Sequence, residues 1–390
     1  MKAVTVLLGT VGLLVPAIAC AAEPVIRLYP AGQVWAYELE AARGLHSAVI
    51  QNTAVINLSV NDLTVETVRF DVLRDHDVVL SRTLHTADLD RAAKTGSALK
   101  ASGMLDVLDF QFAPAKLLAG ASDLAPARTL APGQALYIPV QVLAFAGKPQ
   151  QVRITVDYAG TAADTRTTVP LRFGAVEARF LLPLQGRWVA GAGSTLHSHH
   201  RWAVPEEFAF DFVRYGASGG TYAGDGAKVT DYYAYGAPVL ASADGEVVAS
   251  VDTMPDSTDA MRRAGEALVD YQQRLVAQQG ERLAAGAGTL AGNHVVIRHG
   301  EALYSVYGHL KPGSVGVAVG QKVVAGQAIG AVGTSGNSTE PHLHFHVCDA
   351  PDPLKCVGMP VRFENIEIPF SETPRQVQSG DMIETLPPPR

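Results

Sequence analysis

The chain has 390 residues, of which 47% are hydrophobic and 18% charged, and its formal net charge is −7. This composition excludes a disordered chain and fits two or three folded domains. The acidic balance, with no cluster of Lys and Arg, argues against a nucleic-acid partner and against electrostatic attachment to an anionic membrane.

The first 22 residues have the pattern of a signal peptide. Lys2 precedes the apolar stretch VTVLLGTVGLLVPAIA, and cleavage after Ala21 or Ala22 satisfies the preference for small residues. The stretch is short for a membrane span, and no second one follows, so we expect no stable membrane span. Cys20 leaves lipid attachment open, but Ala17 stands where a lipoprotein box usually has Leu. We therefore expect an exported protein, periplasmic or secreted, that has lost Cys20.

Residues 23–180 carry the pattern of a β-rich domain. In QVRITVDYAG, the side chains of Val152, Ile154, Val156 and Tyr158 fall on one face, and AVINLSV and QALYIPVQVLAF are further strand candidates. Only residues 86–103 have helical character. We predict an antiparallel β-sandwich, immunoglobulin-like, with a helical excursion. Nothing in it suggests chemistry, and it could position the domain that follows, block that domain until activation, or bind a protein partner.

Residues 186–370 have a different sequence pattern, which starts with a Gly/Ala-rich boundary at 186–195. Short strands punctuated by Gly predict tight hairpins and a second β-rich domain. Residues 257–285 break this pattern, because Met261, Leu268, Tyr271 and Leu275 recur at helical spacing. We predict a helical insertion over 256–286, as a surface excursion in preference to a lid or a docking element. Residues 371–390 are predicted to be a C-terminal tail.

Most of the 12 histidines lie between residues 197 and 346, and three of them alternate in the stretch PHLHFHV. In a strand, His342, His344 and His346 would project from one face. A half-buried strand with a polar face is the plain alternative, but three imidazoles favour a metal or proton-transfer site. His346 is expected to be a rim residue, with a role in supporting a ligand or contacting substrate as the alternative.

A possible carboxylate partner precedes these histidines in the stretch LHSHHRWAVPEEFAFDFV. Asp211 projects to the face opposite Phe208, Phe210 and Phe212, where a partly buried carboxylate needs a cation or hydrogen-bond donors. A metal ion would meet that need, and so would an Arg or backbone partner. His309 ends another strand, in YSVYGHLKPGS, from which it could reach into a cleft.

Cys348 and Cys356 flank a Pro-rich loop directly after the histidine strand. In an exported protein, a disulfide that closes this loop is the natural prediction. A metal-binding pair is the alternative, but the spacing makes a zinc–thiolate site a poor fit.

The pieces HRWAVPEEFAFDFV, GNHVVIRHG, YGHL and GNSTEPHLHFHV resemble the lysostaphin/LytM-type zinc metallopeptidases, bacterial endopeptidases that act on peptidoglycan. The resemblance covers about residues 186–365. It implies a zinc ion (Zn²⁺) held by His200, Asp211 and His344. His200 is chosen because it precedes Arg201, as in the longer form of the first motif, while His197 and His199 remain open.

The resemblance further implies that His309 and His342 are catalytic and act on the water and on the transition state. Three protein ligands would leave a fourth tetrahedral position for water, as catalytic zinc sites do. We therefore expect a zinc-dependent endopeptidase that hydrolyses peptide bonds in peptidoglycan stem peptides or cross-bridges. The alternatives are a non-catalytic LytM-like regulator that activates cell-wall amidases and a periplasmic metal-binding protein that uses the histidines at 197–200.

Overall fold

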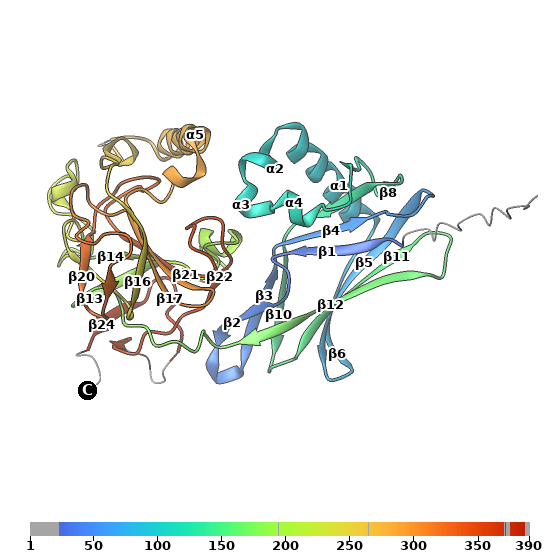
Figure 1. The fold of residues 1–390 in the computed structure, drawn as a ribbon, viewed down its shortest axis with the longest axis horizontal. Coiled ribbons are helices and arrows are strands. Elements are labelled where there is room, and N and C mark those ends of the chain that lie inside the picture. Colours follow the sequence, from blue (N-terminus) through green and yellow to red (C-terminus); the bar gives the residue numbers. More distant parts are fainter. Residues whose placement is uncertain (1–22, 194, 264, 370, 372–374, 387–390) are drawn as a thin grey trace, which may run out of the picture.

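The computed structural model describes residues 23–193, 195–263, 265–369, 371 and 375–386, so the predicted signal peptide and Cys20 lie outside the described residues. The fold is mainly β, as predicted, and consists of an N-terminal and a C-terminal half that lie side by side (Figure 1). None of the helices in the described part of the chain combines the length and the apolar character needed to cross a membrane.

Two sheets build the N-terminal half. One has the strand order β1-β4-β9-β7; the other has the order β10-β3-β2-β12-β11-β5-β6, with β8 on β5. Val55 and Leu136 of the first sheet pack with Val68 and Ile154 of the second in one buried cluster. Most strand pairs are antiparallel, as predicted, but β12 pairs with β2, and β7 with β9, in parallel. An immunoglobulin-like topology stays a prediction. The strand bounds are β1 Val25–Tyr29, β2 Val34–Glu40, β3 Leu45–Ile50, β4 Asn52–Ile56, β5 Leu63–Arg74, β6 Asp77–Leu84, β7 Asp123–Leu124, β8 Thr129–Leu130, β9 Gln134–Ile138, β10 Gln141–Ala146, β11 Gln151–Tyr158 and β12 Asp164–Phe173.

Four helices follow β6 and confirm the predicted helical excursion. They are α1 (Thr86–Ala101), α2 (Met104–Val107), α3 (Asp109–Phe112) and α4 (Pro114–Leu117). Their buried side chains, among them Leu105, Phe112 and Leu117, pack on Ala54 and Tyr137 of the first sheet. Helices α2 to α4 therefore cover the face of that sheet that the sandwich core leaves open, while Leu89 and Ala93 of α1 belong to the sandwich core itself.

One large sheet dominates the C-terminal half. Its strand order is β19-β16-β17-β18-β21-β14-β13-β24-β23, with β22 on β21, and β15 pairs with β20 in a separate ribbon. Part of the predicted C-terminal tail forms β24 in this sheet. The bounds are β13 Arg187–Ala192, β14 Phe210–Val213, β15 Pro238–Leu240, β16 Gly245–Val251, β17 His294–Gly300, β18 Leu303–Gly308, β19 Lys322–Val323, β20 Ala328–Ala331, β21 Leu343–Cys348, β22 Gly358–Met359, β23 Ile366–Glu367 and β24 Met382–Thr385.

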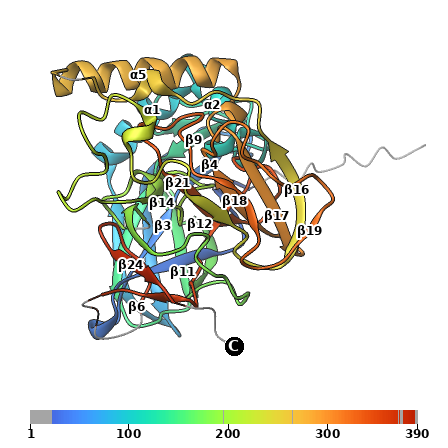
Figure 2. The same cartoon turned by 90° about the vertical axis from the view of Figure 1, so that its left-hand side faces the viewer.

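The α-helix of the C-terminal half, α5 (Leu268–Ala285), lies across one end of the molecule (Figure 2). It begins later than the predicted helix over 257–285, because Gly265 has a positive φ of 73° that interrupts a right-handed helix. The chain before it forms a 3-10 helix, η4 (Thr258–Ala260). None of the described side chains of α5 is fully buried, which agrees with a surface excursion. The other 3-10 helices are η1 (Ala41–Arg43), η2 (His199–Trp202), η3 (Val229–Asp231) and η5 (Ala287–Thr289).

Candidate metal centre

The register of two neighbouring strands brings Asp211 and His344 together. β14 and β21 are antiparallel, and Asp211 lies directly opposite His344. Because side chains alternate along a strand, Phe210 and Phe345 point into the core while the carboxylate and the imidazole share the other face. Oδ1 of Asp211 lies 3.0 Å from Nδ1 of His344.

His200 reaches the same carboxylate from the short helix η2. The hydroxyl of Ser198 accepts a hydrogen bond from the His200 amide and caps this helix. His200 is 2% exposed, and its Nε2 lies 3.3 Å from Oδ2 of Asp211. The neighbouring His199 also approaches Oδ2, at 3.8 Å, but its side chain is 73% exposed. His200 is therefore the nearer and better enclosed of the two.

His309 and His342 lie beside this group. His342 Nε2 is 3.4 Å from Oδ1 of Asp211, and its Nδ1 lies 2.7 Å from the carbonyl oxygen of Glu340. The ring centroids of His309 and His342 are 4.8 Å apart. His309 Nδ1 lies 2.8 Å from the carbonyl oxygen of Ser335. A carbonyl oxygen can only accept a hydrogen bond. Each neutral ring therefore carries its proton on Nδ1 and has its lone pair on Nε2.

Burial and the Asp211 carboxylate together shift the pKa values of these side chains. Burial lowers the pKa of His200 to about 4 and holds the pKa of His309 well below its ordinary value. Burial opposes protonation of His342 and His344 too, but the Asp211 carboxylate outweighs it and raises both pKa values. The pKa of Asp211 is well below normal because, against its burial, the surrounding imidazoles stabilise the charged form.

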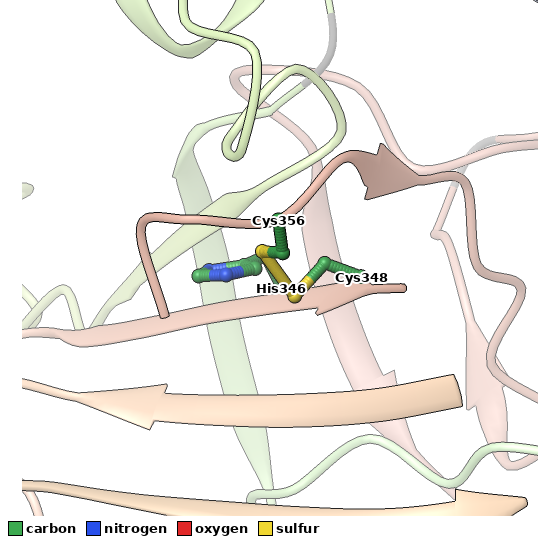
Figure 3. Close-up of side chains that lie close together, drawn as sticks. All are labelled: His346, Cys348 and Cys356. Carbon is green, nitrogen blue, oxygen red and sulfur yellow. A yellow bond between two sulfur atoms is a disulfide. The ribbon is translucent and has the colours of Figure 1, made fainter. Parts of the chain in front are cut away.

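His346 is buried behind His344, so the prediction of a rim residue is wrong. It is 2% exposed, and its Nδ1 lies 2.9 Å from Nε2 of His344. The loop that follows β21 folds back over it, as Figure 3 shows, and the predicted disulfide between Cys348 and Cys356 closes that loop. Although His346 and the two cysteines lie within metal-ligand distance of one another, the disulfide leaves no thiolate to bind an ion.

All five predicted site residues, His200, Asp211, His309, His342 and His344, thus converge on one place. Sequence reasoning missed three groups around them. Glu206 Oε1 lies 3.9 Å from Nε2 of His344, and the carbonyl groups of Ser335 and Glu340 orient two of the histidines. The double Glu at 206–207 was visible in the sequence, whereas no sequence pattern marks the carbonyl contacts.

The distances from Asp211 to His200 and to His344 each fit a zinc ion. Two ligand atoms of a tetrahedral zinc, each about 2.0–2.1 Å from the metal, lie about 3.3 Å apart. The Asp211 oxygens are 3.3 Å from His200 Nε2 and 3.0 Å from His344 Nδ1. A half-buried carboxylate surrounded by imidazoles also has the chemistry of a borderline cation site. Among the described residues, His199, His200 and Asp211 lie close enough together to share an ion, and His344 is not part of that group.

The family model described as Peptidase family M23 matches residues 227–355. This range includes His309, His342 and His344. It begins after His200 and Asp211, so these two residues are tied to the site by their distances alone.

Two curated relatives match parts of the chain. The peptidoglycan DD-endopeptidase ShyA of Vibrio cholerae is 40% identical over 93 residues, 24% of this chain and 20% of that protein. The cell division protein DipM of Caulobacter vibrioides is 28% identical over 116 residues, 30% of this chain and 13% of that protein. The chain thus spans a fifth or less of the length of these relatives.

Among solved structures, the catalytic domain of the antimicrobial peptidase lysostaphin from Staphylococcus simulans is 17% identical to this chain. The match has a TM-score of 0.24 and covers 45% of this chain and 88% of that domain. The family match over residues 227–355 and the match to ShyA agree with the histidine motifs found in the sequence. We conclude that the chain contains a peptidase family M23 domain.

Proposed function

We propose that the chain is a zinc-dependent endopeptidase that hydrolyses peptide bonds in peptidoglycan stem peptides or cross-bridges. The observation that supports this most strongly is the convergence of His200 and His344 on the two oxygens of Asp211, with His309 and His342 alongside. A structural ion pair would not require four imidazoles around one half-buried carboxylate.

His200, Asp211 and His344 would hold the zinc ion. When bound there, zinc would supply Lewis-acid chemistry, polarising a peptide carbonyl and lowering the pKa of water. The anionic Asp211 and the neutral His200 are in the states that metal ligation requires, whereas His344, whose pKa is raised, would have to lose its proton when the ion binds.

His309 and His342 would act on the substrate. Each has its Nδ1–H tied to a backbone carbonyl, so its Nε2 is fixed in orientation and free to accept a proton or, once protonated, to donate one. Such a pair can take a proton from the attacking water and stabilise the oxyanion of the tetrahedral transition state.

The substrate and the location are inferred from the relative and from the sequence. ShyA is named a peptidoglycan DD-endopeptidase, and the acidic chain has no basic surface run that would suggest another polymer. Export by the predicted signal peptide would bring the protein to the cell wall, in the periplasm or outside the cell.

The decisive experiment incubates the purified protein with intact peptidoglycan sacculi. Products are identified by mass spectrometry in three samples: untreated protein, protein treated with a chelator, and chelated protein resupplied with zinc. We expect peptide fragments in the first and third samples only.

Two outcomes would favour the alternatives. Absence of products in all three samples, together with stimulation of an added amidase, would favour a cell-wall regulator. Binding of several zinc ions per chain without hydrolysis would favour a metal-binding protein that uses His197, His199 and His200.

A further inference from the structure

A buried arginine next to His200 joins the two halves of the molecule. Arg201 is 0% exposed, and its Nη1 lies 2.6 Å from Oε1 of Glu207, which is also buried. Its Nη2 donates to the carbonyl and the hydroxyl oxygens of Ser47, on β3 of the N-terminal half. The guanidinium lies over the ring of Tyr37, 5.4 Å from its centroid. One side chain thus joins the His200 segment to two strands of the other half.

Gln51 of the N-terminal half adds a second connection to the same segment. Its Nε2 donates to the carbonyl oxygen of Arg201 at 3.0 Å and to Oε2 of Glu207 at 3.2 Å. Nearby, the Val204 amide donates to the side chain of Gln111 at 2.8 Å, and Val204 packs in the cluster formed with helices α2 to α4. The segment therefore has part of its core in the N-terminal half.

These contacts hold the chain segment that connects two of the proposed metal ligands, His200 and Asp211. The segment from His199 to Ala209 contains only the short helix η2 and no strand, and it leads from His200 to Asp211. Glu206, beside His344, adjoins Glu207, which Arg201 and Gln51 hold. Without Ser47 and Gln51, the buried Arg201–Glu207 pair would lose hydrogen-bond partners, which is costly for a buried ion pair.

We propose that the N-terminal half is a constitutive part of the metal centre, and that Arg201 and Gln51 are positioning residues that hold the His200 segment in its ligand-bearing conformation. This inference rests on the proposed role of His200 as a zinc ligand. It assigns to the N-terminal half a supporting role, in place of a detachable cover or a module that only recruits a partner.

The test compares two glutamine variants of the full-length protein. Gln51→Ala removes both hydrogen bonds to the segment. Gln376→Ala is the matched control, because Gln376 is also a buried glutamine with two bonds across the halves, to the Gly174 carbonyl and from the Glu38 amide, neither of which involves the His200 segment. Zinc affinity is measured by competition with a chromophoric chelator, and hydrogen exchange of the amides at 199–209 is measured in metal-free protein.

We expect Gln51→Ala to weaken zinc binding about 10-fold or more and to speed exchange across 199–209, while Gln376→Ala changes neither. Wild-type affinity and wild-type exchange in Gln51→Ala would overturn the inference. If wild-type protein binds no zinc, the proposed function fails, and the exchange comparison still decides whether Gln51 holds the segment.

A second variant covers the case in which Gln51→Ala does not fold. Arg201→Lys keeps a charge beside Glu207 but cannot bond to Glu207 and Ser47 as the guanidinium does. We expect intermediate losses of zinc affinity and amide protection, and no loss of either would also contradict the proposal.

Discussion

At the scale of single residues, we propose that the candidate site separates groups that bind metal from groups that move protons. His342 Nε2 lies near Asp211, and the Glu340 carbonyl accepts a hydrogen bond from its Nδ1, which fixes the ring. His342 is not needed as a ligand, because His200, Asp211 and His344 would already supply three. His309 is held in the same way by Ser335. Their loss should therefore affect chemistry more than metal binding.

We predict that His342→Ala and His309→Ala each lower the rate of peptidoglycan hydrolysis by about 10²–10⁴-fold, the usual contribution of a general acid or base. Each should retain one zinc per chain. The measurement is the initial rate of fragment release by the two variants, with metal content determined on the same samples. Loss of the metal along with the activity would instead make these residues ligands.

His346 should tune zinc binding through His344. His346 Nδ1 can accept the Nε2–H of His344, which leaves His344 Nδ1 free to face the metal. We predict that His346→Phe weakens zinc binding by about 10–100-fold, measured by chelator competition. His46→Phe is a suitable control, because it removes an equally enclosed histidine from the other half. Equal affinity in the two variants would rule out this role.

Alternation along the strands predicted much at this scale. The face shared by His342, His344 and His346, and the placement of Asp211 opposite the phenylalanines, follow from the period of two. The burial of His346 did not follow, since it depends on a loop that folds back over the strand from residues 349–357. A period identifies the face of a strand but not what covers that face.

At the scale of elements, the pairing of β14 with β21 makes the site. These strands are separated by more than a hundred residues, and their register places Asp211 opposite His344. Local sequence patterns do not indicate which distant strands become neighbours. They therefore predicted both strands but not the pairing of β14 with β21. The family resemblance supplied the pairing that the residues alone did not.

The disulfide in the loop between β21 and β22 should contribute to the stability of the protein. The bridge joins residues eight apart in sequence, and closing so short a loop typically contributes about 2–3 kcal/mol to the free energy of unfolding. We predict a loss of that size for the double variant Cys348→Ser with Cys356→Ser, measured by chemical denaturation under oxidising conditions. An unchanged unfolding midpoint would show that the loop is held by its other contacts.

Strand β5 carries a buried carboxylate that links stability to pH. The pKa of Asp71 is lowered because, despite its burial, Ser81, Arg153 and Arg69 bond to the charged form. Its contribution is therefore complete above its unfolded pKa and is lost as the pH falls through the folded one. We predict that Asp71→Asn costs about 1–3 kcal/mol at pH 7 and progressively less in acid, measured by denaturation from pH 7 to pH 2. A pH-independent difference would contradict this.

At the scale of the whole molecule, the two halves share a buried polar interface next to the site. Ser47 and Gln51 meet Arg201 and Glu207, which lie about 150 residues further along the chain. The sequence predicted the two domains as separate units, because patterns and composition change between them. Contacts between domains leave no such pattern, and for that reason the role of the N-terminal half could not be derived from the sequence.

Zinc content is the measurement that tests the central claim most directly. We predict one zinc ion per chain in the wild-type protein and none in Asp211→Ala, because that substitution removes the carboxylate on which His200 and His344 converge. Both proteins are metal-loaded, desalted and assayed by elemental mass spectrometry, with circular dichroism to show that the variant is folded. A wild-type protein without zinc, or a folded Asp211→Ala variant that keeps its zinc, would contradict the account.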